Sequence, residues 1–229
     1  MRRPRETIDS APELVSRPPR TQSRVLMTTL SLPTQMPLRS MTPVAGDPAR
    51  DVLLHDAMTR RTHLADLWVY APRAVILVFL RQYGCPLCRE QVTALSGHYD
   101  AFRAEGVAVA AIGQGTPRDA RRFREQFSLP FPVLSDADRS AFAAYGLMDG
   151  TIEQVYSPTP GLRLARAMLR GHLPHRTVGS VRQLPGTFVI DRNGIIRMAH
   201  PGLHAADVPK IPTLLPQIIA MVPLPTPAT

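Results

Sequence analysis

The longest uninterrupted hydrophobic segment of the chain leads directly into a segment with helical periodicity. Residues 74–80 read Ala-Val-Ile-Leu-Val-Phe-Leu, and we expect a buried strand over 74–81. From Pro86 onward, hydrophobic residues recur at helical spacing, at Leu87, Val92, Leu95, Tyr99 and Phe102. This spacing predicts an amphipathic helix over 86–104 that begins just after the strand ends.

The other hydrophobic segments predict an alternation of strands and helices. Pro132 cannot donate to a sheet ladder, so we expect the strand at 131–134 to lie at a sheet edge. Asn193-Gly194 favours a tight hairpin between two late strands. In chain order we expect short strands or turns at 52–54 and 63–67, a strand at 107–112, a helix from Pro117 to about Phe127, the strand at 131–134, a helix from Asp138 to Tyr145 ended by Gly146, strands at 187–191 and 195–199, and a proline-interrupted helix at 206–221.

This order of elements predicts one α/β domain over residues 47–222. Strand–helix alternation followed by a hairpin and a last helix is typical of a mixed central sheet with helices on both faces. Residues 150–183 fit the alternation poorly, and we interpret them as a helical and loop insertion with one helix near 162–169. Residues 1–46 are rich in proline and arginine and lack an apolar period, so we expect a disordered tail, with a second tail at 223–229.

The two cysteines of the chain, Cys85 and Cys88, form a C-x-x-C motif at the predicted junction of strand and helix. Free backbone N–H groups and the helix dipole at this position favour a thiolate over a thiol. Pro86 suits the first helical position because it lacks an N–H. The pattern therefore predicts a redox-active dithiol at the carboxyl end of a strand, where active groups of such sheets lie.

Two other interpretations of the motif are a structural disulfide and half of a zinc site. Zinc would need further ligands, and the chain has no second cysteine pair. The histidine pairs His172/His175 and His200/His204 are distant in sequence, and such short spacings arise readily by chance. We therefore expect no metal and no cofactor.

Composition narrows the class of protein further. The net charge of +9 comes almost wholly from arginine, with no basic stripe interleaved with aromatics, so we expect no nucleic-acid partner. The longest apolar run is far shorter than the roughly 20 residues of a spanning helix, so we expect no membrane partner. The first residues make a poor signal peptide, and two cysteines do not form a secreted disulfide framework. We therefore expect a cytoplasmic protein.

Four segments together resemble the alkyl hydroperoxide reductase/thiol-specific antioxidant (AhpC/TSA) family, the peroxiredoxin-like branch of the thioredoxin fold. They are Phe79–Arg89 with the cysteine motif, Val109–Gly115, Phe131–Asp136 and Leu184–Asp191, and the resemblance spans residues 50 to about 220. The resemblance implies a thioredoxin-like fold with a peroxidatic Cys85 and a resolving Cys88. It also implies that Pro185 stands where thioredoxin-like proteins place a cis-proline, an ordinary trans proline being the alternative, with Thr187 just beyond it on the strand.

The sequence departs from the peroxiredoxin pattern at two positions. Gln82 stands where the family has Thr or Ser three residues before the reactive cysteine, and Pro185 replaces an arginine that precedes the later strand. Both changes favour a disulfide oxidoreductase over a fast peroxidase. Arg81 or Arg89 could supply the missing positive charge, although for Arg89 a solvated surface position is the stronger expectation.

The sequence thus predicts a thiol-dependent antioxidant enzyme that reduces hydroperoxides through Cys85 and Cys88. We expect a thioredoxin-like protein or a small thiol as its reductant. A homodimer is consistent with the sequence, which does not decide the oligomeric state. The alternatives are a thiol-disulfide or organic endoperoxide reductase with the same dithiol, and a non-catalytic redox sensor whose partner binds the insertion or the N-terminal tail. Lesser candidates are Gln114 as a substrate contact, Trp68 as a core residue that reports redox state, and Asp136 and Asp138 as helix caps.

Overall fold

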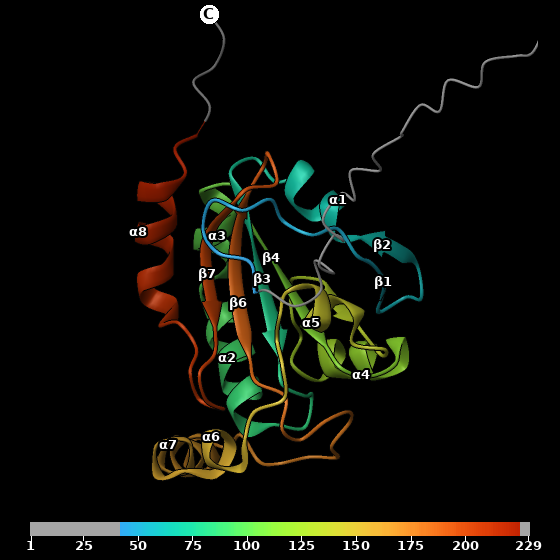
Figure 1. Cartoon of the computed structure of the whole chain (residues 1–229), viewed down its shortest axis with the longest axis vertical. Helices are drawn as coiled ribbons and strands as arrows, with labels where there is room; N and C mark the ends of the chain where they lie inside the picture. Colours follow the sequence, from blue (N-terminus) through green and yellow to red (C-terminus); the bar gives the residue numbers. More distant parts are fainter. Residues whose placement is uncertain (1–41, 225–229) are drawn as a thin grey trace, which may run out of the picture. The chain divides into compact units, whose positions relative to one another are not determined.

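The computed structural model describes residues 42–224, which form a seven-stranded mixed sheet covered by helices (Figure 1). The strand order is β2-β1-β5-β4-β3-β6-β7. The predicted tails at 1–46 and 223–229 fall mainly outside the described residues. The strands are β1 (Leu53–Asp56), β2 (Arg61–His63), β3 (Ala74–Leu80), β4 (Val107–Gly113), β5 (Val133–Ser135), β6 (Gly186–Asp191) and β7 (Ile196–Pro201).

The uninterrupted apolar segment forms the buried strand β3, as predicted, and β3 lies inside the sheet between β4 and β6. It pairs in parallel with β4 and antiparallel with β6, and all seven of its residues are buried. A strand covered on both faces has no polar side, which is why its sequence shows no alternation. Ile76, Val78 and Leu80 pack into one core, whereas Val75, Leu77 and Phe79 pack into the other.

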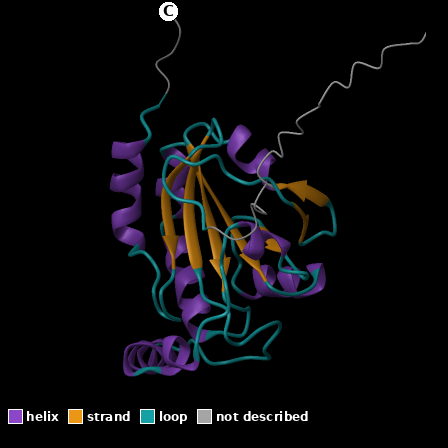
Figure 2. Cartoon of the chain, viewed as in Figure 1, coloured by secondary structure: helices purple, strands orange, loops and turns teal. Residues whose placement is uncertain are grey.

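Helices cover both faces of the sheet, as Figure 2 shows, and each group of helices closes one core. The larger core contains side chains of α2 (Pro86–Gly97), α3 (Tyr99–Ala104), α4 (Pro117–Gln126) and α8 (Ile211–Met221). The second core contains side chains of α1 (Leu64–Val69) and α5 (Ser140–Ala144). The predicted α/β class, with helices on both faces, is confirmed.

The prediction of an edge position for the strand at 131–134 is wrong. Strand β5 lies between β4 and β1, because the β1–β2 hairpin pairs antiparallel with its outer side. Pro132 precedes the first residue of β5, and its carbonyl accepts a hydrogen bond from the Ala111 N–H. The missing N–H of this proline therefore removes no ladder bond from the interior strand.

Three predicted helical or strand segments also differ from the structure. Residues 63–67 are not one element, because β2 ends at His63 and α1 begins at Leu64. The helix predicted over 86–104 is two helices, α2 and α3, separated at His98, where the backbone leaves the helical region. The last helix begins at Ile211 rather than 206, after Pro209 and with Pro212 in its first turn.

The insertion at 150–183 contains two helices where the sequence predicted one. These are α6 (Ile152–Tyr156) and α7 (Pro158–Leu169), and Ser157 separates them. Helix α7 contacts α2, and both insertion helices lie at the end of the sheet where β3 leads into α2 (Figure 1). The insertion therefore lies beside the cysteine motif.

The predicted cap at the start of α5 is present. Asp136 Oδ2 accepts a hydrogen bond from the Phe142 N–H at 3.0 Å, and Asp138 Oδ1 accepts one from the Ser140 N–H at 3.1 Å. Gly146 ends this segment with a φ of +65°, a left-handed conformation that glycine adopts without strain. Within residues 42–224, no helix is both long and apolar enough to cross a membrane.

Candidate active site

The cysteine motif lies where the sequence predicts it, at the junction of β3 and α2. Cys85 occupies the N-cap position of α2 in an extended conformation, and Pro86 follows in the first turn. Both cysteines are unpaired thiols and both are buried, with 6% of Cys85 and 2% of Cys88 exposed. Cys88 is one helical turn further on, so the two sulfurs face the same region.

The buried Arg81 guanidinium is the positive charge closest to the reactive pair. Its Nη1 donates to Cys85 Sγ at 3.4 Å. Its Nε donates to the Gln183 carbonyl at 2.8 Å, and its Nη2 donates to the Val181 carbonyl at 2.7 Å. Among the described residues, no carboxylate forms an ion pair with Arg81. A Cys85 thiolate is therefore the negative charge that this guanidinium is placed to stabilise.

The environment shifts the pKa values of the two cysteines in opposite directions. The hydrogen bond from the Cys88 thiol, followed by the charge of Arg81, lowers the pKa of Cys85 to about 6 against the opposing effect of burial. The backbone N–H groups of Cys88 and Leu87 lower the pKa of Cys85 further. Donation to Cys85 and burial raise the pKa of Cys88 well above that of a free thiol. Cys85 is thus the thiolate of the pair, and Cys88 keeps its proton.

The segment that holds Arg81 is itself anchored by Gln114, a role that the sequence analysis missed. The buried Gln114 amide donates to the carbonyls of Arg81 and Ser180, and its oxygen accepts from the Ser180 N–H at 2.9 Å. Gly179 packs against it with a φ of +84°. Gln114 is therefore a buried bridge between residues 81 and 180, and its predicted contact with substrate is wrong.

Gly84, immediately before Cys85, is required by a close backbone contact. The His175 N–H donates to the Gly84 carbonyl at 3.1 Å. A Cβ atom at position 84 would lie 2.5 Å from the His175 carbonyl oxygen and 2.6 Å from that of Arg176. The chain segment that closes the site can pass this close only because residue 84 has no side chain.

We expect Gly84→Ala to destabilise the protein by about 2 to 3 kcal/mol, because rigid backbone must move to admit the methyl group. Thermal unfolding measures the change. Gly97→Ala is the matched control: Gly97 is also a glycine of this region, but nothing lies within 4 Å of its Cβ position at the end of α2. Equal stability losses in the two variants would contradict the explanation.

Three further residues predicted to shape the site lie near it. Gln82 is buried next to Arg81, and its backbone carbonyl accepts from the Cys85 N–H at 3.2 Å. Pro185 and Cys88 line the same cavity, but the structure has no cis peptide bond among the described residues, so the cis-proline prediction is wrong. The Pro185 carbonyl accepts from the Gly202 N–H, and the chain enters β6 in an extended, trans conformation. Thr187 follows on β6, as predicted, and is buried.

Two other expectations fail for reasons of tertiary structure. Arg89 is not a surface residue: its guanidinium lies 4.9 Å from the centre of the Phe127 ring and donates to the Leu173 carbonyl. Trp68 is a core residue, as predicted, but it packs beside Gly194 at the end of the sheet where β3 begins. The length of β3, about 23 Å, separates that end from Cys85, so Trp68 is poorly placed to report its redox state.

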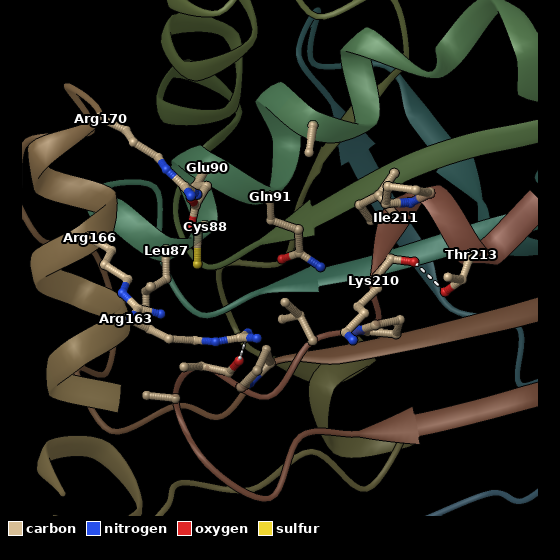
Figure 3. Close-up of a pocket in the computed structure, with 17 residues that line it drawn as sticks. Leu87, Cys88, Glu90, Gln91, Arg163, Arg166, Arg170, Lys210, Ile211 and Thr213 are labelled. Atoms are coloured by element: carbon tan, nitrogen blue, oxygen red, sulfur yellow. Dashed lines mark hydrogen bonds and ion pairs between the residues drawn. The ribbon is translucent and has the colours of Figure 1, made fainter. Parts of the chain in front are cut away.

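Cavities open on two sides of the dithiol, and each contains one of the cysteines. The first, which we call the apolar cavity, has a volume of about 270 Å³ and includes Cys85, with Val155 of α6 and Leu164 and Met168 of α7 in its wall. The second, of about 490 Å³, includes Cys88 and is drawn in Figure 3. Leu164 and Met168 lie four residues apart in the helix that the sequence predicts at 162–169, a spacing that puts them on one face.

The geometry fits thiol redox chemistry. Among the described residues, no group of three or more His, Cys, Asp or Glu side chains is placed to hold a metal ion. A thiolate beside a protonated thiol can attack an electrophilic oxygen or sulfur and then close a disulfide. A mixed sheet with such a dithiol where β3 leads into α2 defines the class of thioredoxin-like thiol oxidoreductases.

Comparison with known proteins gives the family. The model of the AhpC/TSA family matches residues 45–199, and the chain belongs to this family. The solved structure of peroxidoxin BcpB from Mycobacterium tuberculosis superposes with a TM-score of 0.55 over 78% of this chain and 95% of that one, at 17% identity. This likeness confirms the thioredoxin-like fold.

Curated relatives include both peroxiredoxins and disulfide oxidoreductases. The chain is 30% identical over 160 residues to Rv2521 of Mycobacterium tuberculosis, which is named as a peroxiredoxin, covering 70% of this chain and 86% of that protein. It is 26% identical over 153 residues to the thiol-disulfide oxidoreductase ResA of Geobacillus thermodenitrificans, covering 66% of each. Its match to the thioredoxin-like protein AAED1, chloroplastic, of Arabidopsis thaliana is 28% over 127 residues, covering 56% of this chain and 50% of that protein.

Proposed function

We propose that the protein reduces organic hydroperoxides, with Cys85 as the attacking thiolate and Cys88 as the resolving thiol. The observation that carries this proposal is a buried Cys85 whose pKa is lowered to about 6 and which is hydrogen-bonded to Arg81 at the floor of the apolar cavity. A thiolate is the reactive form of cysteine toward peroxides, and at neutral pH it predominates here.

The reaction proceeds in two balanced steps. The Cys85 thiolate attacks the terminal oxygen of ROOH, the O–O bond breaks, and the products are a Cys85 sulfenic acid and an alkoxide that leaves as ROH after taking a proton. The Cys88 thiol then condenses with the sulfenic acid, giving the Cys85–Cys88 disulfide and water. Arg81 stabilises the thiolate before the first step and is placed to donate a hydrogen bond to the leaving oxygen.

The lining of the apolar cavity favours a substrate that carries an organic group. Val155, Leu164 and Met168 offer only hydrocarbon and thioether surface, and Pro160 lies between the two helices. Burial of apolar surface stabilises binding by roughly 25 cal/mol per Å². A hydroperoxide with an aryl or alkyl group would gain this stabilisation, and hydrogen peroxide would not.

Thiol-disulfide exchange is the second candidate function, and the position of Gln82 favours it. The family resemblance implies a side-chain hydroxyl at this position to orient the peroxide, and the amide side chain of Gln82 has no hydroxyl. The similarity to ResA adds support. A disulfide whose reduced form is stabilised by a low cysteine pKa is also a strong oxidant.

The deciding experiment compares the oxidants of reduced protein. Cumene hydroperoxide, hydrogen peroxide and an oxidised dithiol protein are each mixed with the fully reduced chain, and the remaining thiols are counted by rapid quench and alkylation. We expect cumene hydroperoxide to react at least about tenfold faster than hydrogen peroxide, since only it fills the apolar cavity. Faster reaction with the oxidised dithiol protein than with either peroxide would favour the second function. Oxidation by one equivalent with no turnover when a reductant is supplied would favour the sensor.

We propose further that the protein works in the cytoplasm, where glutathione and thioredoxin systems keep thiols reduced. The disulfide formed in each cycle needs a dithiol protein or a small thiol to reduce it and regenerate the two cysteine thiols. The homodimer stays a prediction, and gel filtration of the purified chain tests it.

A further inference from the structure

The larger of the two cavities at the dithiol is strongly basic. Arg163, Arg166 and Arg170 project into it from α7 at positions i, i+3 and i+7, so they share one face of the helix (Figure 3). Lys210 lies on the opposite wall, just before α8. We call this space the basic cavity.

The positive charges of the basic cavity are only partly balanced. Its single carboxylate, Glu90, pairs with Arg170 at 2.5 Å. Arg163 donates to the Ala206 carbonyl at 3.0 Å, which is not a charged partner. Arg166 and Lys210 have no ion-pair partner among the described residues. Like charges three and four residues apart on a helix repel each other, and an anion in the cavity would remove this repulsion.

A buried amide in the same cavity also lacks a partner. Gln91 is 5% exposed, and its Nε2 makes no hydrogen bond to any described residue. Figure 3 shows this amide directed into the space between Cys88 and Lys210. A buried N–H donor without an acceptor is rare in folded proteins, and a carboxylate oxygen of a bound ligand would satisfy it.

Of the two cysteines, only Cys88 lines the basic cavity, whereas Cys85 lines the apolar one. In the oxidised protein, a thiolate that arrives through the basic cavity therefore meets the Cys88 sulfur. Attack at that sulfur expels Cys85, the thiolate that Arg81 stabilises, and the more stable thiolate leaves faster.

We propose that the basic cavity binds a low-molecular-weight thiol bearing at least two carboxylates, and that this thiol attacks Cys88 to reduce the Cys85–Cys88 disulfide. The volume of about 490 Å³ suits a small molecule rather than a protein surface. The inference rests on the proposed function for the formation of the disulfide. Oxidant and reductant then reach the dithiol from different sides.

The reductive cycle balances with two thiols. The first thiolate, RS⁻, forms an RS–Cys88 bond while the Cys85–Cys88 bond breaks and Cys85 leaves as a thiolate. A second thiolate attacks the RS sulfur, which releases RSSR and a Cys88 thiolate that takes up a proton. Two thiols are oxidised and one protein disulfide is reduced.

The test measures reduction alone, on protein whose disulfide has been formed with oxidised dithiothreitol, so that it does not depend on peroxidase activity. Glutathione is the anionic probe, and its diethyl ester is the matched probe without free carboxylates. The rate at which each probe reduces the protein disulfide is divided by the rate at which the same probe reduces 2-hydroxyethyl disulfide. This ratio corrects for the difference in intrinsic reactivity between the two thiols. We expect glutathione to be favoured over the ester by at least about tenfold at low ionic strength, and the preference to shrink in high salt.

Variants locate the preference. Arg166→Glu should remove most of it, Arg166→Lys should keep it, and Arg118→Glu, which makes the same charge change on the exposed side of α4 outside both cavities, should leave it unchanged. After rapid acid quench and alkylation, tandem mass spectrometry should find glutathione on Cys88. Equal loss in Arg118→Glu, glutathione attached to Cys85, or no preference for the anionic probe would overturn the proposal. The proposal would also be overturned if Arg166→Glu slowed only the oxidation of the protein by a carboxylate-bearing hydroperoxide and not the reduction of its disulfide.

Discussion

Replacement of Cys85 by serine is expected to lower the rate of hydroperoxide reduction by more than about 10³-fold, because the hydroxyl that replaces the thiolate is not ionised at neutral pH and cannot form a sulfenic acid. The variant should fold, since serine is of similar size at this buried position. Turnover of cumene hydroperoxide with a thiol reductant measures the effect.

The matched variant Cys88→Ser separates attack from resolution. Its Cys85 should still react with one equivalent of peroxide, but the product should stop at the sulfenic acid, which dimedone traps. The serine hydroxyl can still donate a hydrogen bond to Cys85, so Cys88→Ser should keep this first step, whereas Cys88→Ala, which has no donor, should slow it, because the hydrogen bond from Cys88 is the largest cause of the low pKa of Cys85. Rapid oxidation of Cys85→Ser together with an inert Cys88→Ser would reverse the assignment of the two cysteines.

Replacement of Arg81 by methionine is expected to shift the pH dependence of Cys85 alkylation. In the native chain the pKa of Cys85 is lowered to about 6, so the rate should rise from pH 5 and level off above pH 7. Removal of an adjacent positive charge disfavours the thiolate and should move the inflection upward by roughly 1 to 2 pH units. At a fixed pH below the inflection, each unit by which the pKa of Cys85 rises lowers the alkylation rate about tenfold.

Two control variants make this result specific to the charge beside Cys85. Arg81→Lys keeps a positive charge and should retain part of the shift, although lysine cannot make the three directed bonds of the guanidinium. Arg89→Met removes a buried arginine from the same region, but Arg89 lies over Phe127 and does not contact Cys85. An inflection that moves equally in Arg81→Met and Arg89→Met would show that the shift comes from general loss of structure.

Arg81 and Arg89 also illustrate how much of the site the sequence could give. Both arginines flank the cysteine motif by four residues or fewer, and the sequence favoured Arg81 only by placing Arg89 at the solvated surface, although Arg89 is buried. The choice is made by residues far along the chain: the carbonyls of Val181 and Gln183 hold Arg81 against Cys85, and the carbonyl of Leu173 holds Arg89 away from it. Each of these contacts spans more than 80 residues of sequence.

The two cavities likewise depend on contacts between segments that are distant in the sequence. The sequence indicates a helix near 162–169, but its spacing alone does not show that one face of α7 meets Cys85 while its arginines meet Cys88. Nor does it show that Gln114 anchors the segment around Ser180. These relations depend on where the insertion folds back over the end of the sheet.

The sequence by itself determined the strand β3, the start of α2, the position of the dithiol between them and the family. These features are local: an apolar run, a helical period, a proline at the first turn and a cysteine spacing act within some 30 residues, and local backbone preference fixes them. The tertiary structure alone decided the interior position of β5, the trans bond before Pro185, the partner of Cys85 and the charge of each cavity. Those depend on contacts between distant segments, whose free energies appear only after the chain has folded and brought the segments together.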